Sequence, residues 1–247
     1  MDKVLYLAMS GARENMLAQQ AHANNLANAN TTGFKTDLAQ ARAMQVFGDG
    51  HASRVYAQTE RPATDMSSGT LIETGRKLDL AIAGDGWITV QRPDGTEAYT
   101  RGGELQVDVN NQLVTGGGLP VMGNGGIPVI LPPFENLDIG TDGTITVRPL
   151  GDNANQLVLV DQIKLVNPDR QNLFKDRDGL MVTDNAQPLP ADQNVRVRSG
   201  YIESSNVNAV NELTGIITTS RQFEMQVRMM KTAQENSEAA AAILRLS

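Results

Sequence analysis

Hydrophobic positions in the last part of the chain, residues 206–247, recur at alternating intervals of three and four. The series consists of Leu213, Ile216, Ser220, Phe223, Val227, Met230, Gln234, Ser237, Ala241 and Leu244. Side chains with this spacing lie along one stripe of an α-helix, as in a coiled coil. The segment contains no proline, and a helix of about 40 residues would be roughly 60 Å long. The pattern therefore predicts a long helix that needs a partner.

The first thirty residues carry a second stripe with the same spacing. It consists of Leu5, Met9, Ala12, Met16, Gln19, Ala23, Leu26 and Asn30. Amide and hydroxyl side chains occur in both stripes, and such residues lower stability but restrict register and oligomeric state. Gly215, which costs about 1 kcal/mol relative to alanine inside a helix, indicates a close helix approach, a slight bend or a tolerated substitution. Spacing alone equally allows two core helices of an ordinary globular domain.

Between the two helical segments the pattern changes to short apolar runs separated by turn signals. Such turn signals include Gly84-Asp85-Gly86, Pro93-Asp94-Gly95 and Gly140-Thr141-Asp142-Gly143. Strands are expected over residues 54–59, 78–82, 87–91, 97–101, 104–109, 127–131, 144–147, 156–166, 179–183 and 195–202. Short strands with turn signals at intervals of about eight to twelve residues are typical of a β-sandwich or an irregular barrel.

The sequence thus predicts a mixed α and β protein with a discontinuous helical domain. Residues 1–35 and 204–247 are expected to form a coiled-coil domain from both termini, in which the apolar stripe residues make subunit contacts. Residues 71–203 are expected to form a central all-β domain, and residues 36–70 an irregular connecting segment.

Charge is distributed unevenly along the 247 residues, whose net charge is −7. Residues 62–205 carry eleven basic and nineteen acidic side chains, whereas both ends are close to neutral. An acidic middle repels nucleic acid. No apolar run approaches the eighteen or so residues of a membrane span, and the N-terminus is too short and too weakly basic for a cleaved secretory signal. These features argue against a nucleic-acid partner and against membrane insertion.

Candidate chemistry is sparse. The sequence contains no cysteine and two histidines, His22 and His51. No cluster of histidine, cysteine and carboxylate has the spacing of a metal site, and no Gly-x-Ser-x-Gly motif is present. Asp176-Arg177-Asp178-Gly179 lacks most ligands of a calcium loop and is interpreted as a turn. We therefore expect no catalytic residue, no metal and no cofactor, and a protein that is not an enzyme.

Two motifs resemble the bacterial flagellar rod, hook and hook-filament axial proteins. The first comprises Asn24, Asn25, Leu26, Ala27 and Asn28, followed by Thr32, Gly33, Phe34 and Lys35; the second comprises Glu203, Ser204, Ser205, Asn206 and Val207. The segment 221–233 is most similar to rod proteins of this family. The resemblance is strong at both termini and extends into the middle in shorter pieces, such as Leu78–Ile82 and Tyr99-Thr100-Arg101.

The resemblance implies a structural subunit of the flagellar basal-body rod, in its proximal part. By the same resemblance, the terminal helices would form a hollow drive shaft that transmits torque to the hook, with the β domain outside. The rod spans the periplasm, and such chains are exported by the flagellar type III apparatus without a cleaved signal peptide. The implied partners are proximal and distal rod subunits, copies of the chain itself and the export apparatus.

Two alternatives remain open from the sequence. One is a distal rod protein of the same family. The other, from a different class, is a wall-cleaving enzyme associated with the rod. The absence of a paired catalytic constellation argues against the enzyme.

Overall fold

The computed structural model describes residues 2–38, 41–45, 55–59, 63–150, 157–184 and 187–245. The chain divides into two compact units, and each unit combines segments that are distant in sequence. The helical unit comprises residues 1–29, 36–65 and 207–247, and the β unit comprises residues 30–35 and 66–206. Neither described helix has the length and the hydropathy needed to cross a lipid bilayer.

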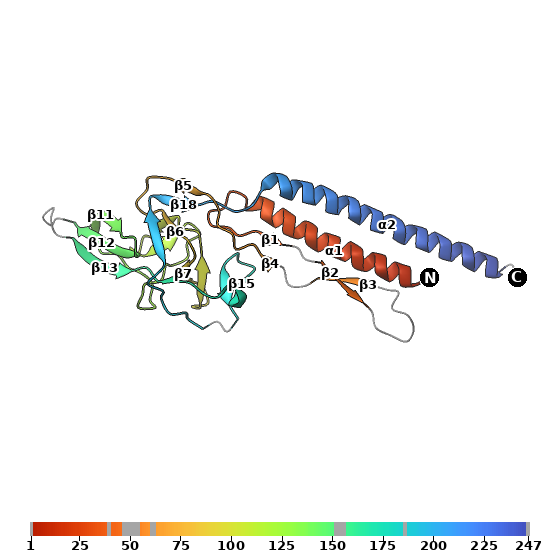
Figure 1. Ribbon diagram of the computed structural model, residues 1–247, viewed down its shortest axis with the longest axis horizontal. Helices are drawn as coiled ribbons and strands as arrows, with labels where there is room; N and C mark the ends of the chain where they lie inside the picture. The colour runs from red at the N-terminus through yellow and green to blue at the C-terminus, as the bar shows by residue number, and fades with distance from the viewer. Residues whose placement is uncertain are drawn as a thin grey trace. The chain divides into compact units, whose positions relative to one another are not determined.

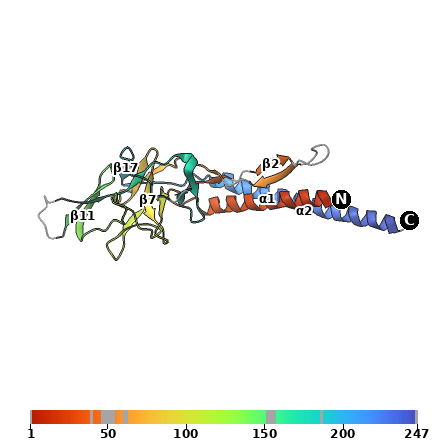
Figure 2. The same ribbon diagram turned by 90° about the horizontal axis from the view of Figure 1, so that it is seen from below.

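The helical unit is built on two long helices, α1 (Asp2–Ala27) and α2 (Ala209–Arg245). They lie side by side in both views, and α2 continues past the N-terminal end of α1 (Figures 1 and 2). Gly11 faces Gln226 while His22 faces Gly215, so the two helices run antiparallel.

The start of α2 is capped by Asn208. Its side-chain oxygen accepts hydrogen bonds from the backbone N–H groups of Val210, at 3.1 Å, and Asn211, at 3.2 Å. These donors have no partner within the first turn of a helix, and asparagine is among the residues that satisfy them best. The cap explains why α2 begins where it does.

Short strands accompany the helices in the same unit. β1 (Asp37–Leu38) pairs with β4 (Ala63–Thr64), and β2 (Ala41–Gln45) pairs with β3 (Val55–Thr59), both antiparallel. The strand expected over residues 54–59 is thus present in β3. The segment 36–70, expected to be irregular, contains these two strand pairs; its residues 39–40, 46–54 and 60–62 lie outside the described residues.

The β unit contains only strands and one short 3₁₀ turn, η1 (Arg170–Asn172), among its described residues, which confirms the all-β prediction for the central region. Its strands are β5 (Leu71–Glu73), β6 (Leu80–Ala83), β7 (Trp87–Gln91), β8 (Glu97–Thr100), β9 (Leu105–Val107), β10 (Leu113–Thr115), β11 (Phe134–Ile139), β12 (Thr144–Pro149), β13 (Val158–Gln162), β14 (Leu165–Val166), β15 (Leu173–Lys175), β16 (Met181–Thr183), β17 (Arg196–Ser199) and β18 (Tyr201–Glu203).

The strands of the β unit are divided among several small sheets. A five-stranded sheet has the order β14-β7-β8-β16-β15, and a three-stranded sheet has the order β11-β12-β13. β9 pairs with β10, β6 with β17, and β5 with β18. All described pairs are antiparallel.

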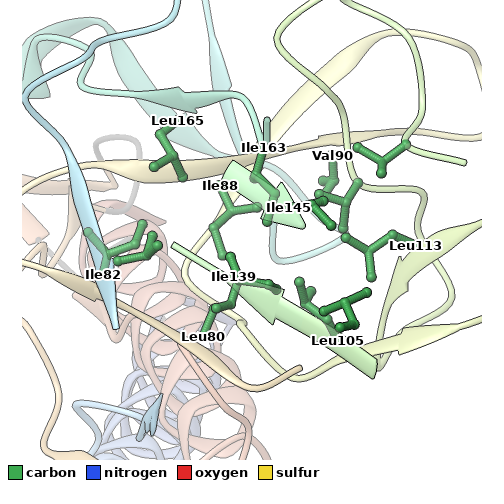
Figure 3. Close-up of a cluster of buried hydrophobic side chains, with 14 of the residues drawn as sticks. Leu80, Ile82, Ile88, Val90, Leu105, Leu113, Ile139, Ile145, Ile163 and Leu165 are labelled. Carbon is green, nitrogen blue, oxygen red and sulfur yellow. The ribbon is translucent and has the colours of Figure 1, made fainter. Parts of the chain in front are cut away.

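One hydrophobic core joins these small sheets. Leu80, Ile88, Leu105, Leu113 and Ile145 come from five different strands, and each is 0% exposed. Their side chains point into the same interior (Figure 3). Burying an aliphatic side chain of this size contributes roughly 1.5–3 kcal/mol. The shared interior therefore makes one unit out of sheets that are individually too small to be stable.

The turn signals locate several strand ends correctly. β7 and β8 pair across the predicted turn at Pro93-Asp94-Gly95, where Gly95 has a φ of +85°. The strand expected over residues 127–131 is wrong: this segment makes only isolated bridges, at Pro128 and Ile130. Proline has no N–H to donate to a strand ladder, which explains the interruption. The single strand expected over residues 156–166 is divided into β13 and β14.

Candidate functional site

The contact between α1 and α2 buries every second residue of the two predicted stripes. These residues are buried or half-buried: Leu5, Ala12, Gln19 and Leu26 on α1, and Ile216, Phe223, Met230 and Ser237 on α2. They recur every seven residues on each helix, so they remain on one side of it over the whole contact. The predicted spacing is correct for this half of each stripe.

At the alternate positions, the buried side chains are displaced by one residue toward the N-terminus on both helices. The buried or half-buried residues there are Ala8, Asn15 and His22 on α1, and Glu212, Thr219, Gln226 and Ala233 on α2. The stripe residues Met9, Met16, Ala23, Leu213, Val227 and Ala241 are exposed instead. These six do not line the contact between α1 and α2 within the chain, and their expected contacts between subunits stay a prediction. The side chain of Leu244 lies outside the described residues.

Two glycines accommodate large side chains of the opposite helix in this contact. A Cβ atom added at Gly11 would lie 2.9 Å from the Gln226 side chain, and one added at Gly215 would lie 2.7 Å from the His22 ring. The distance between packed helices is set by the side chains at their contact. Glycine at these two positions therefore leaves room within the contact for the larger Gln226 and His22 side chains. Gly215 permits a close approach, as one of its sequence interpretations proposed.

A polar group completes the contact near the C-terminal end of α1. His22 Nδ1 and Glu212 Oε2 lie 2.6 Å apart, and Asn25 Nδ2 donates to the same carboxylate at 3.3 Å. Asn25 also exchanges two hydrogen bonds with the Asp37 backbone in β1, each 2.9 Å long. Asn25 is buried, so these partners satisfy an amide that would otherwise be costly to bury. This signature residue therefore has a structural role within the helical unit.

The exposed stripe residues lie on one side of the helix pair. Each helix turns by about 100° per residue, so a position one residue after a contact residue faces the same flank all along the helix. Because the helices run antiparallel, these two flanks face the same side of the pair. We call Met9, Met16, Ala23, Leu213 and Val227 the apolar face.

The opposite flank of α1 is covered within the chain. Glu14, Ala18 and Ala21 on that flank are half-buried, and Asn25 is buried. α1 contacts β1 and β3 in addition to α2. The apolar face is thus the side of α1 that the described strands leave open.

The second part of the family signature surrounds Glu203 in the β unit. Glu203 Oε1 accepts hydrogen bonds from Lys35 Nζ at 2.6 Å and from the Gly69 N–H at 2.9 Å, and Oε2 accepts one from Arg101 Nη1 at 2.9 Å. All three charged side chains are buried. Burial raises the pKa of the Glu203 carboxyl, but the Lys35 hydrogen bond, the Arg101 charge and the Gly69 N–H outweigh it, so this pKa lies below its ordinary value.

The backbone around this ion cluster joins the two motifs. The Gly33 N–H donates to the Glu203 carbonyl at 2.8 Å, and the Asn206 N–H donates to the Phe34 carbonyl at 3.3 Å. Gly33 has a φ of +68°, and an added Cβ would lie 2.2 Å from the Arg101 carbonyl carbon, so only glycine fits there. The Ser205 carbonyl accepts a hydrogen bond from the Ser204 hydroxyl at 3.2 Å.

The remaining signature residues lie at the helix ends. Asn28 donates from its backbone and its side chain to the Asn24 carbonyl, at 3.1 and 3.0 Å, and so continues the hydrogen bonding beyond Ala27, the last residue of α1. Val207 is half-buried and precedes α2. The sequence identified Lys35 and Arg101 as parts of separate motifs, but no spacing indicated that both contact Glu203.

Within the described part of the chain, no group of three or more histidine, cysteine, aspartate or glutamate side chains is placed to hold a metal ion. The features that stand out are therefore an exposed apolar face on the helices and a buried ion cluster that joins the two motifs. The first suits protein–protein contact, and the second connects segments of the β unit that are distant in sequence.

Three protein families match different parts of the chain. "Flagella basal body rod protein" matches residues 5–35, "Flagellar hook protein FlgE/F/G D1 domain" matches residues 81–147, and "Flagellar basal body rod FlgEFG protein C-terminal" matches residues 198–243. The first match contains the apolar-face residues of α1, and the third contains those of α2. Together the matches cover both helices and part of the β unit.

Curated relatives extend the similarity to the whole chain. The flagellar basal-body rod protein FlgF of Salmonella typhimurium strain LT2 is 39% identical over 253 residues, and FlgF of Escherichia coli K12 is 38% identical; both alignments cover all of this chain and all of the relative. The rod protein FlgG of Agrobacterium fabrum C58 is 34% identical over 92% of this chain and 95% of the relative. The chain therefore belongs to the FlgF family of flagellar basal-body rod proteins.

Proposed function

We propose that this chain is a structural subunit of the flagellar basal-body rod and that its terminal helices make the contacts between subunits. The observation that carries the proposal is the apolar face. Met9, Met16, Leu213 and Val227 are 42–58% exposed on one side of the helix pair. Burying such side chains against a neighbour would contribute up to roughly 1.5–3 kcal/mol each, and this contribution would recur in every subunit of a polymer.

The unequal lengths of the helices support the same proposal. α2 has 37 residues and α1 has 26, so the C-terminal part of α2 extends beyond α1 (Figure 1). Ala239, Ala241 and Ala242 in this part are exposed. Small side chains allow another helix to approach closely. A neighbouring subunit would supply a helical partner there, which the described part of the chain does not provide.

In this proposal the terminal segments 1–35 and 204–247 pair with those of neighbours as coiled coils and form the wall of a hollow drive shaft. The shaft spans the periplasm and transmits torque to the hook. The partners are other proximal and distal rod subunits and copies of the chain, and the flagellar type III apparatus exports it without a cleaved signal. No enzymatic step is involved. Relatives named as rod proteins support this mechanical role.

A distal position in the rod is the second candidate. FlgG of Agrobacterium fabrum aligns along most of the chain at 34% identity, so one fold serves both rod proteins. The FlgF relatives, which align with the whole chain, favour the FlgF position.

The test is a double substitution on the apolar face, Leu213→Asp with Val227→Asp, in cells that lack the unmodified chain. Two carboxylates placed in a subunit contact would have to lose water, which is costly without a partner. The cells should build no hook and should not swim, while the purified variant keeps its β-sheet circular dichroism. Val109→Asp is the matched control, because Val109 is also apolar and exposed but lies in the β unit. Normal basal bodies in the double variant would refute the proposed contact.

A further inference from the structure

The methionine side chains of this chain differ greatly in exposure. Met122 and Met181, in the β unit, are 3% and 2% exposed. Met9, Met16, Met225 and Met229, in the helical unit, are 50%, 58%, 56% and 48% exposed. The chain contains no cysteine, so methionine thioethers are its oxidisable sulfur atoms. Oxidation of such groups depends on access of the oxidant to the sulfur.

The four exposed methionines fall on different sides of the helix pair. Met9 and Met16 belong to the apolar face, together with Val227. At about 100° per residue, Met225 and Met229 fall on the flank of α2 opposite Val227. The helix pair therefore offers two pairs of similarly exposed methionines, of which one pair lies on the proposed subunit contact.

We propose that Met9 and Met16 form an oxidation-sensitive modification site that controls whether a subunit can assemble. The inference rests on the proposed function, because it requires the apolar face to be a subunit contact. A peroxide is the co-reactant. Its O–O bond breaks, one oxygen atom forms an S–O bond to the thioether, and water is released from hydrogen peroxide. Sulfur loses two electrons and the peroxide gains them.

The chemistry of the product explains the effect on assembly. A sulfoxide is polar and chiral, whereas the thioether is apolar and adapts its shape to its neighbours. Burying the sulfoxide oxygen against Leu213 or Val227 of a neighbour would remove its hydrogen bonds to water without replacing them. Free subunits are reactive at this site, and subunits already docked are protected. Sulfoxide reductases reverse the modification, so the block is not permanent.

The chemical part is tested on the purified full chain with hydrogen peroxide, followed by peptide mass spectrometry over time. Met9, Met16, Met225 and Met229 should be oxidised at least about tenfold faster than Met122 and Met181, because access differs. Equal rates for Met9, Met16 and the two buried methionines would overturn the inference at this step.

The assembly part uses glutamine as a polar substitute for the sulfoxide. Cells carrying Met9→Gln with Met16→Gln should yield at least tenfold fewer isolated hook–basal bodies. Cells carrying Met225→Gln with Met229→Gln should yield the normal number. The variant Met9→Leu with Met16→Leu should assemble normally. It should also still assemble after the free subunit has been treated with peroxide. Circular dichroism of each purified variant verifies that the helices still form.

The outcomes separate the inference from the proposed function. If Met9→Gln with Met16→Gln assembles normally while Leu213→Asp with Val227→Asp does not, the apolar face is a contact and the oxidation site is refuted. The same holds if the Met225 and Met229 variant loses assembly equally. If all polar substitutions on the apolar face assemble normally, the proposed function itself fails, and the inference with it.

Discussion

The helical unit and the β unit place their large hydrophobic side chains in opposite ways. In the β unit, Leu80, Ile88 and Ile145 are completely buried in one shared core. In the helical unit, the hydrophobic residues that are buried most fully among those described are Ala8 and Ala12, while Met16 and Leu213 remain exposed. Hydrophobic burial is the main favourable contribution to folding. The β unit therefore buries its own large hydrophobic residues, whereas several of those on the helices remain exposed, as the proposed subunit contact requires.

The difference also extends to charged groups. Glu203 is buried with two cations in the β unit. In the helical unit, the Glu212 carboxylate, itself 10% exposed, contacts a single histidine, His22, whose side chain is 28% exposed. Buried ion clusters tolerate the loss of a member poorly, whereas exposed charges are screened by water. Substitutions of similar chemical size should therefore have unequal effects at buried and at exposed ion pairs.

The largest effect is expected from Glu203→Gln. The substitution leaves Lys35 and Arg101 buried without their carboxylate, and breaking a buried ion pair in this way costs about 3–5 kcal/mol. The β unit should unfold at a distinctly lower urea concentration. Asp138→Asn is the matched control: Asp138 pairs with Lys77 in an ion pair that is about half exposed, and its loss should cost at most about 1 kcal/mol. Equal midpoints for the two variants would contradict the assignment of the ion cluster.

The next effect compares one aliphatic truncation in each unit. Ile145→Ala should lower the free energy of unfolding by about 2–5 kcal/mol, because it leaves a cavity in a closed core. Leu213→Ala should change the free energy of unfolding of the isolated chain by no more than about 0.5 kcal/mol, since its side chain is about half exposed. Urea titration followed by circular dichroism measures both. A large loss for Leu213→Ala would mean that the helices form a self-contained core.

The comparison of predicted and observed contacts shows which information sequence spacing lacks. Spacing predicted both helices and the contact positions Ala12, which is buried, and Phe223, which is half-buried. At Met9 the buried residue is instead the preceding Ala8, because hydrophobic spacing on one helix does not determine which side pairs with α2. Spacing carries the period of a helix, but the exact side that faces a partner depends on the sizes of residues on both helices.

The ion cluster was less predictable still. Lys35 and Glu203 are separated by 168 positions, and no periodicity relates residues that meet only after the strands have paired. The resemblance to rod proteins identified the motifs that contain Lys35, Arg101 and Glu203, without indicating what they do. β11 was missed because it directly follows Pro132 and Pro133, and consecutive prolines are typical of turns and loops.

The smallest effect concerns pH. The pKa of Glu203 is lowered in the folded chain, so its contribution to stability is complete above the pKa of the unfolded carboxyl, about 4.3, and is lost as pH falls through the folded value. The β unit should therefore become less stable only below about pH 4. Glu203→Gln should be less stable at neutral pH but should lose less on acidification. The informative window is about pH 3 to 5, roughly one unit on either side of the carboxyl pKa. If the stability of the two chains changed in parallel over this window, the assigned shift of the Glu203 pKa would be refuted.

The central claim is that the apolar face is open in the free subunit and covered in the rod. Because the chain has no cysteine, Val227→Cys introduces a unique thiol on this face. Its labelling by a maleimide should be rapid in the purified chain and at least about tenfold slower in isolated basal bodies, since a buried thiol is inert. Val109→Cys, in the β unit, reports whether the reagent reaches assembled subunits. Equal labelling of Val227→Cys in free chain and basal bodies would contradict the account.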